Sequence, residues 1–200
     1  PEDFQTKFQK ILKQDRGGGY WIWKSAIIQE NMDKIDEGDF LIYIDAGCKL
    51  NNNGKKRFYE YIDLLNDSEY GIISFQMPHI ENNWTTRQTF EYFNIKPDNY
   101  IAKSGQYVGG IIIIQKCKHS EFILKKYTET LYRAPLLFTD FHNKLQQYSE
   151  FNDHRHDQSV LSIIRKRYGS VVIDGDESWI VPFGSDESLK YPFWAMTSKS

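Results

Sequence analysis

The sequence predicts an α/β fold in which helices flank a mixed, mostly parallel central sheet. Short apolar runs typical of buried strands alternate along the chain with helical patterns, and short polar joints separate them. Strands that are joined through helices tend to pair in parallel. The 200 residues, 40% of them hydrophobic, suffice for one core, and no repeat or linker divides them, so we expect a single domain over 1–200.

The first elements are expected to be two helices and a strand. Apolar residues at helical spacing predict a helix over 4–12, and the glycines at 17–19 end it. A second helix is expected over about 24–35 and is stopped by Gly38. The apolar run that follows predicts a strand over 39–45.

The middle of the chain repeats this alternation. Apolar spacing predicts a helix over about 55–65, a strand over 71–76 and a short helix over about 84–94. A run rich in isoleucine gives the strongest strand pattern, over 107–114, and a helix over about 120–132 follows it.

Charge and composition exclude several classes of protein. The formal net charge of -2 argues against a general binder of nucleic acid or anionic membranes, which usually shows a basic excess. Cys48 and Cys117 are too few for a disulfide framework or a thiolate metal site, so a reducing, cytoplasmic location is expected. No apolar run approaches the ~20 residues that span a bilayer, and no signal-peptide pattern is visible.

One acidic residue closes the strand expected over 39–45. The apolar run ends abruptly at Asp45, and the small residues Ala46 and Gly47 follow it. Ligands of open α/β sheets collect beyond the carboxyl ends of the strands, and small residues let a bulky substrate approach the backbone. Asp45 is therefore the first candidate for a functional residue. The alternative is that Asp45 only begins the turn into 51–54.

A second polar group, 152–159, lies before and in the first turn of a helix expected over 157–168, the clearest helix of the C-terminal half. The N–H groups and dipole of a helix N-terminus attract anions and favour an ionised Asp157, and a neutral imidazole beside it could complete the shell of a cation. The alternative is that Asp157 caps the helix while His154 and His156 are exposed loop residues.

The glycine run at 17–19 is flanked by Arg16 and Lys24. Backbone N–H groups of such a turn could hold a phosphate group, with Arg16 or Lys24 supplying positive charge. The segment is not a P-loop, because the Gly-Lys-Ser/Thr end is absent, and it is not a dinucleotide-binding fingerprint. The alternative is a helix stop followed by a turn.

Five segments follow one another in a specific order: GYWIWK at 19–24, GDFLIYIDAGC at 38–48, WTTRQTF at 84–90, HRHDQS at 154–159 and YPFWA at 191–195. In this order they resemble a poorly characterised group of GT-A-type glycosyltransferases, encoded in bacterial surface-polysaccharide loci and by large DNA viruses. The resemblance covers nearly the whole chain and implies a GT-A-like catalytic domain. Such folds place a strand-helix unit, which helps to hold the nucleotide base, ahead of the first residue here, and we expect the domain to lack it.

The resemblance implies a donor and cation site around Asp45. In GT-A enzymes a strand ends in an Asp-x-Asp motif whose carboxylates meet the donor ribose and a divalent cation on the diphosphate. Asp45 matches the first Asp of the motif, and Gly47 stands at the second. A Mn²⁺ or Mg²⁺ ion would therefore be bound by Asp45 together with His156 or Asp157.

Further donor contacts follow from the same resemblance. Lys24 or Arg16 would share the charge of the diphosphate if the cation is weakly held. Gly109 and Gly110 match a small-residue strand that approaches the transferred sugar, and Gln158 matches a position that contacts the sugar.

Asp157 and His156 match the position where GT-A enzymes place a catalytic base or a sugar contact. In an inverting enzyme Asp157 would deprotonate the acceptor hydroxyl, whereas in a retaining enzyme no protein base is strictly required and Asp157 would orient the donor. Trp84 and Arg87 are expected to contact the acceptor through stacking and hydrogen bonding.

We therefore expect a glycosyltransferase that moves a sugar from a nucleotide-sugar donor, a UDP-sugar above all, onto a saccharide acceptor of a surface glycan or glycoprotein. Two alternatives stay open. A sugar-phosphate nucleotidyltransferase would use a similar sheet, but it usually carries a Gly-rich loop with Arg and Lys near its N-terminus. A non-catalytic glycan-binding module derived from a transferase would be consistent with Gly47.

Overall fold

The computed structural model of the protein describes residues 2–196. Its strands are β1 (Phe40–Ile44), β2 (Lys49–Leu50), β3 (Ile73–Ile80), β4 (Gly105–Tyr107), β5 (Ile111–Gln115), β6 (Val171–Asp174) and β7 (Phe193–Trp194). Its α-helices are α1 (Glu2–Leu12), α2 (Gly17–Tyr20), α3 (Trp23–Met32), α4 (Lys55–Asn66), α5 (Glu81–Trp84), α6 (Arg87–Tyr92), α7 (Tyr100–Lys103), α8 (Lys118–Arg133) and α9 (Asp157–Tyr168). Short 3-10 turns are η1 (Asn52–Gly54), η2 (Pro135–Phe138), η3 (Asp140–Lys144) and η4 (Ser188–Lys190).

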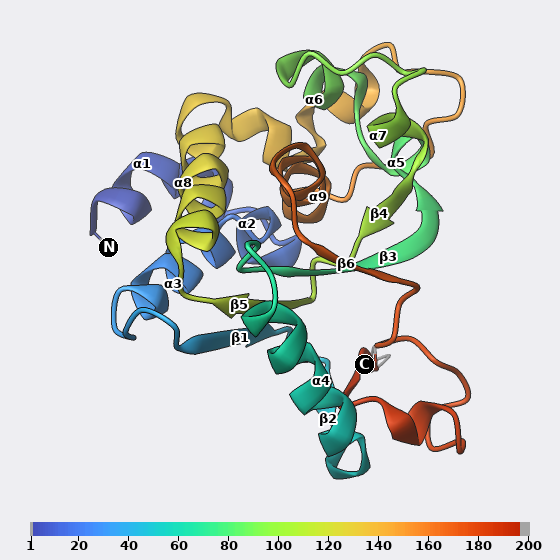
Figure 1. The fold of residues 1–200 in the computed structure, drawn as a ribbon. Coiled ribbons are helices and arrows are strands. Elements are labelled where there is room, and N and C mark those ends of the chain that lie inside the picture. Colours follow the sequence, from blue (N-terminus) through green and yellow to red (C-terminus); the bar gives the residue numbers. More distant parts are fainter. Residues whose placement is uncertain (1, 197–200) are drawn as a thin grey trace.

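Strands cross the middle of the molecule and helices cover both sides (Figure 1). α1, α3, α8 and α9 lie on one side of β1 and β5, and α4 lies with the C-terminal segment on the other. Alternate residues of β5 serve the two sides: Ile112 and Ile114 belong to the core with α8 and α9, while Ile111 and Ile113 belong to the core with α4. A strand that is buried on both faces explains the uninterrupted isoleucine run.

The sheet is mixed, but the prediction of mostly parallel pairing is wrong. β1 pairs antiparallel with β5, β4 pairs antiparallel with β3, and β2 pairs antiparallel with β7. Among the strands of residues 2–196, only β3 and β6 pair in parallel. An antiparallel bridge between Ile72 and Ile114 joins β5 to the start of β3. β1 and β3 therefore run in the same direction, as the intervening helix α4 predicts, but β5 lies between them and runs the other way.

Most predicted helices are confirmed, and two predicted elements are divided. The helices expected over 55–65, 120–132 and 157–168 correspond to α4, α8 and α9. The helix expected over 84–94 is divided into α5 and α6 by extended backbone at Thr85 and Thr86, whose hydroxyls bond to Glu81 and Thr89. Threonine readily makes such local bonds in place of helical ones.

The strand expected over 107–114 is divided as well. β4 ends at Tyr107 and β5 begins at Ile111, and each pairs with a different strand. The chain crosses between the two strands at Gly109 and Gly110. This break, which the unbroken apolar pattern conceals, places two small residues in the wall of the site described below.

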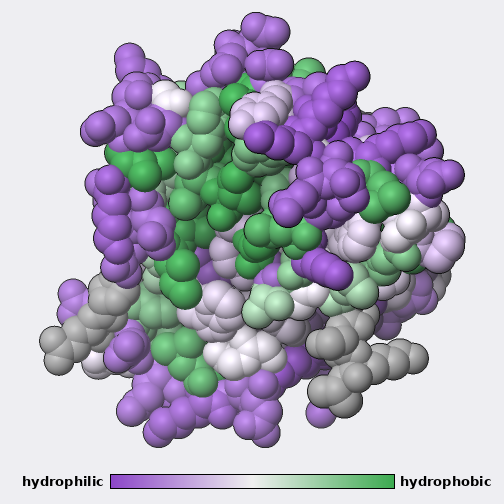
Figure 2. Space-filling model, turned by 90° about the horizontal axis from the view of Figure 1, so that it is seen from below, coloured by the Kyte–Doolittle hydropathy of each residue, from purple (hydrophilic) through white to green (hydrophobic). Residues whose placement is uncertain are grey.

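One face of the molecule carries apolar side chains. Figure 2 shows them gathered on the face that is seen from the side of α4 and the C-terminal segment. Of the helices described in residues 2–196, none combines the length and the apolar character needed to cross a membrane.

Candidate functional site

Four segments meet at a polar cavity of about 170 Å³, where β1 ends and α9 begins. Its lining consists of Arg16, Trp21, Lys24, Asp45, Gly109, Gly110, Arg155, His156, Asp157 and Gln158. The structure thus brings together most of the residues that the sequence analysis singled out. Trp21 and Arg155 were not among the candidates, although both lie inside the segments that carried the resemblance.

The side chain of Asp45 faces this cavity and is 42% exposed. Its Oδ1 accepts a hydrogen bond from the hydroxyl of Tyr43 over 2.6 Å. Asp45 does begin a turn, but only its backbone takes part: the N–H of Cys48 donates to the carbonyl of Asp45 over 2.9 Å. The carboxylate itself is available to a ligand.

Lys24, in the first turn of α3, lies between two carboxylates, although its side chain is only 3% exposed. Its Nζ is 2.7 Å from Oδ2 of Asp157 and 3.6 Å from Oδ1 of Asp45. The ammonium also donates to the carbonyl of Gly109 over 3.0 Å. An ammonium buried to this extent requires such partners, because an unpaired charge away from water is very costly.

Asp157 is buried and does not cap α9. The N-cap position is held by His156, and the carboxylate of Asp157 contacts Lys24 instead. Burial raises the pKa of Asp157 above its usual value, while the nearby ammonium of Lys24 opposes that rise. Loss of solvation is thus the largest influence on the pKa of this carboxyl, and the ammonium of Lys24 favours its ionised form.

Both histidines of the segment are buried, so their interpretation as exposed loop residues is wrong. The ring of His156 packs against Tyr20 and Trp21, with centroids 5.1 and 5.6 Å away, and its Nε2 lies 2.8 Å from Asp140. Burial lowers the pKa of His156, although the carboxylate of Asp140 opposes this. His156 is thereby turned toward Asp140 and not toward Asp45.

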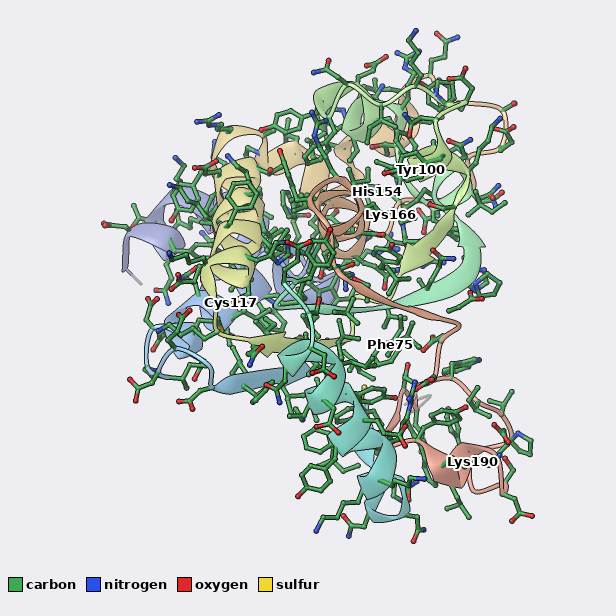
Figure 3. The ribbon with its side chains drawn as sticks, viewed as in Figure 1. Phe75, Tyr100, Cys117, His154, Lys166 and Lys190 are labelled. Atoms are coloured by element: carbon green, nitrogen blue, oxygen red, sulfur yellow. The ribbon has the colours of Figure 1, made fainter. Side chains whose placement is uncertain are left out.

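His154 serves the fold. Its Nδ1 accepts from the N–H of Thr86 over 3.3 Å, so its Nε2 carries the proton and donates to the carbonyl of Leu137 over 2.7 Å. The side chain is fully buried, and burial lowers its pKa to about 3. His154, shortly before α9, and the side chain of Lys166, in α9, lie inside the molecule, whereas Lys190 lies at its surface in the C-terminal segment (Figure 3).

The glycine run forms a left-handed turn and not a phosphate loop. All residues from 17 to 21 have positive φ, including Tyr20 at 57° and Trp21 at 58°. The N–H groups of residues 18–22 donate to carbonyls within the same segment, so they are not free to hold a phosphate. Instead the turn places the rings of Tyr20 and Trp21 against His156. Gly19 has no room for a side chain, since a Cβ would lie 2.6 Å from Cα of Leu12.

The backbone at Gly109 and Gly110 passes so close to Gln158 and Asp45 that a larger residue at either glycine position would collide with these side chains. A Cβ on Gly110 would lie 2.8 Å from Oδ2 of Asp45, and one on Gly109 would lie 2.7 Å from Cβ of Gln158. Gln158 accepts from the N–H of Gly109 over 2.9 Å and donates to Oε1 of Gln106 over 2.6 Å. Gln106 in turn donates to the buried Glu81 over 2.8 Å, so a hydrogen-bonded chain holds this wall of the cavity.

Three candidate residues lie outside the cavity lining. Gly47 is exposed in the turn after β1. Arg87 pairs with Glu91 over 3.2 Å. Trp84 does not line the cavity but contacts Arg155, which does: the Arg155 guanidinium lies 4.2 Å from the centroid of the Trp84 ring.

The residues present do not fit a divalent cation at this position. Asp45 and Asp157 supply oxygen ligands, but the ammonium of Lys24 lies between them, and His156 pairs with Asp140. Within residues 2–196 no group of three or more His, Cys, Asp or Glu side chains is arranged to hold a metal ion.

A larger cavity of about 640 Å³ lies against β1, α4 and the C-terminal segment. Its walls are mainly apolar and include Ile42, Ile44, Phe58 and Phe193. Opposing charges do not converge there, whereas they do at the smaller cavity. The smaller cavity is therefore the candidate site for chemistry.

The fold has counterparts among solved structures. It is similar to the crystal structure of a glycosyltransferase involved in the glycosylation of the major capsid of PBCV-1, with a TM-score of 0.51 and 15% identity over 94% of this chain and 73% of that chain. A second match, to apo mouse xyloside xylosyltransferase 1, has a TM-score of 0.42 and 14% identity over 89% of this chain and 60% of that one. The first likeness shows a shared fold, and the second is too distant to carry an argument. No family model matches the sequence, and neither does any curated protein.

Proposed function

We propose that the protein is a nucleotide-sugar-dependent glycosyltransferase whose donor site is the cavity at the end of β1. One observation carries this proposal: Asp45, Lys24 and Asp157 converge on the small residues Gly109 and Gly110 in a fold shared with a glycosyltransferase. Ligand sites of α/β proteins form at such strand ends. The expected donor is a UDP-sugar, and the expected acceptor is a saccharide of a surface glycan or glycoprotein.

The geometry suggests a role for each side chain. Asp45 would accept hydrogen bonds from hydroxyls of the donor, because its carboxylate is exposed to the cavity. Gly109 and Gly110 would let the sugar approach the backbone, and Gln158 would hold that backbone in place. During transfer the acceptor oxygen bonds to the anomeric carbon while the bond from that carbon to the diphosphate breaks.

The proton of the acceptor hydroxyl must leave during this step. In an inverting reaction Asp157 would take it, and burial, which raises the pKa of this carboxyl, makes it a better proton acceptor. In a retaining reaction the departing diphosphate would take the proton, and Asp157 would orient the donor. His156 would support either role by fixing the start of α9 through its contact with Asp140.

A ligand screen tests the proposal. The melting temperature of the full chain is measured with UDP, GDP, CDP, ADP and the corresponding nucleotide sugars. Each compound that raises the melting temperature is then titrated calorimetrically. We expect one nucleoside diphosphate and its sugar conjugates to bind, and slow hydrolysis of the conjugate in the absence of an acceptor. If no member of the series binds, the proposed function is wrong.

A glycan-binding module without transferase activity is the second candidate, favoured by Gly47 at the position where the motif has its second Asp. It predicts that oligosaccharides raise the melting temperature and that nucleotides do not. The same screen, extended to a panel of oligosaccharides, separates the two candidates.

A further inference from the structure

The ammonium group of Lys24 lies between the carboxylates of Asp45 and Asp157. Nζ of Lys24 contacts Asp157 at 2.7 Å, Asp45 at 3.6 Å and the carbonyl of Gly109 at 3.0 Å. The side chain is almost fully buried, and Nζ also lies 5.0 Å from the centroid of the Tyr43 ring. A second cation between these carboxylates would be a few ångströms from the ammonium and would be repelled by it. Lys24 would have to leave a buried position before a metal ion could enter.

The positive charge that remains available to a ligand is on Arg155. Its side chain is 44% exposed, and its ion-pair partner Asp153 is 3.9 Å away. Arg16, by contrast, is bonded to Asp140 at 3.0 Å and to Asp153 at 3.3 Å, which uses much of its hydrogen-bonding capacity. Arg155 therefore has N–H groups to offer to a phosphate, in the paired geometry that a guanidinium favours.

Arg155 is also held in position before any ligand arrives. Its guanidinium lies 4.2 Å from the centroid of the Trp84 ring, and its backbone N–H donates to the carbonyl of Trp84 over 3.2 Å. Such stacking leaves the edge of the guanidinium free and reduces the freedom that binding would otherwise remove. The residue stands two positions before α9, whose N-terminal dipole favours an anion at the same place.

We propose that the site binds the diphosphate of its donor without a divalent cation: Lys24 offsets part of the negative charge of the two carboxylates, and Arg155, stacked on Trp84, contacts the phosphates. This inference rests on the proposed function. It replaces the metal of the expected motif with two fixed side-chain cations and assigns phosphate binding to Arg155.

Calorimetric titration of the full chain with UDP, in EDTA and in Mn²⁺, tests the proposal. GDP, CDP and ADP replace UDP if the screen identifies one of them as the binder. We expect the two dissociation constants to agree within about twofold, since the cation takes no part in binding. Binding in Mn²⁺ that is lost in EDTA overturns this inference and leaves the proposed function standing. Failure to bind under both conditions overturns both.

Variants of Arg155 test the assignment of phosphate contact. Arg155→Ala should weaken UDP binding about tenfold or more, as expected for a lost hydrogen bond to a charged group. Arg155→Lys should recover part of that loss, and uridine, which has no phosphate, should bind the wild type and Arg155→Ala equally. The matched control is Arg133→Ala, which removes an exposed arginine at the end of α8 and should leave UDP binding unchanged. Equal binding of UDP to wild type and Arg155→Ala would overturn the assignment.

Discussion

The ammonium of Lys24 lies 2.7 Å from the carboxylate of Asp157, and the two side chains are only 3% and 6% exposed. The pair joins α3 to the start of α9, and its two residues are 133 positions apart in the sequence. In a buried pair each partner leaves an uncompensated charge when the other is removed, so stability and function at this site are linked.

A double-mutant cycle measures that pair. Lys24→Met and Asp157→Asn should each lower the free energy of unfolding by about 3 kcal/mol, because each strands the other partner away from water. The double variant should lose at least about 1 kcal/mol less than the sum of the two single losses. Urea unfolding gives the values. The control is Lys34→Met: the exposed pair of Lys34 and Glu30, 2.9 Å apart, should contribute no more than about 0.5 kcal/mol. Strictly additive losses would contradict the pairing.

Asp45→Asn should strongly reduce activity and leave the fold intact. The side chain is 42% exposed, so we expect the melting temperature to change by only a few degrees, about the effect of an ordinary surface substitution. Donor hydrolysis or transfer should fall by about a hundredfold or more, in line with the loss of a group that contacts the reacting substrate. Asp39→Asn, at the opposite, exposed end of the same strand, is the matched control and should keep full activity. An equal loss of folding in Asp45→Asn would favour the turn interpretation of this residue.

Gly110→Ala should displace Asp45 without unfolding the protein. The added methyl group would lie 2.8 Å from Oδ2, and the half-exposed carboxylate can yield by moving outward. A shift of this size in a contacting group can reduce turnover by about a hundredfold. Gly47→Ala, whose added methyl group would lie 3.2 Å from the carbonyl of Met196, should have a smaller effect on turnover. Unchanged turnover in Gly110→Ala would show that the position of Asp45 does not matter to the reaction.

Acid should destabilise the protein in part through His154. Burial lowers the pKa of this group to about 3 in the folded chain, against 6.5 as its ordinary value. Below pH 6.5 the unfolded chain binds a proton that the folded chain does not, so the free energy of unfolding falls by up to about 1.4 kcal/mol per pH unit towards pH 3. Above pH 6.5 this contribution is constant.

The variant His154→Gln isolates that effect. It should be less stable than wild type at pH 7.5 because two buried hydrogen bonds are disturbed. Its stability should nevertheless decline less steeply between pH 6.5 and 5, measured by urea unfolding at each pH. Some decline should remain, because burial also lowers the pKa of His156. The same steepness in variant and wild type would show that His154 is not a source of the acid sensitivity.

Local patterns were sufficient for most helices and for the place of the site along the chain. α4, α8 and α9 follow from apolar spacing, since a period of 3.6 residues is a property of neighbours in sequence. Asp45 was found because an apolar strand ends on a carboxylate, and the polar segment before α9 was found from the density of its charged residues. Arg155 lies inside that segment between the two histidines, yet nothing local distinguished it from Arg16.

By itself, then, the sequence determined the alternation of helices with strands and the residues that can carry charge to a strand end. Only the tertiary structure decided that β5 lies between β1 and β3, that Gly109 and Gly110 divide a continuous apolar run, and that the ammonium of Lys24 lies between Asp45 and Asp157. The physical reason is distance along the chain. Strand order and the burial of a charge depend on packing between segments far apart in sequence, and no local pattern records that packing.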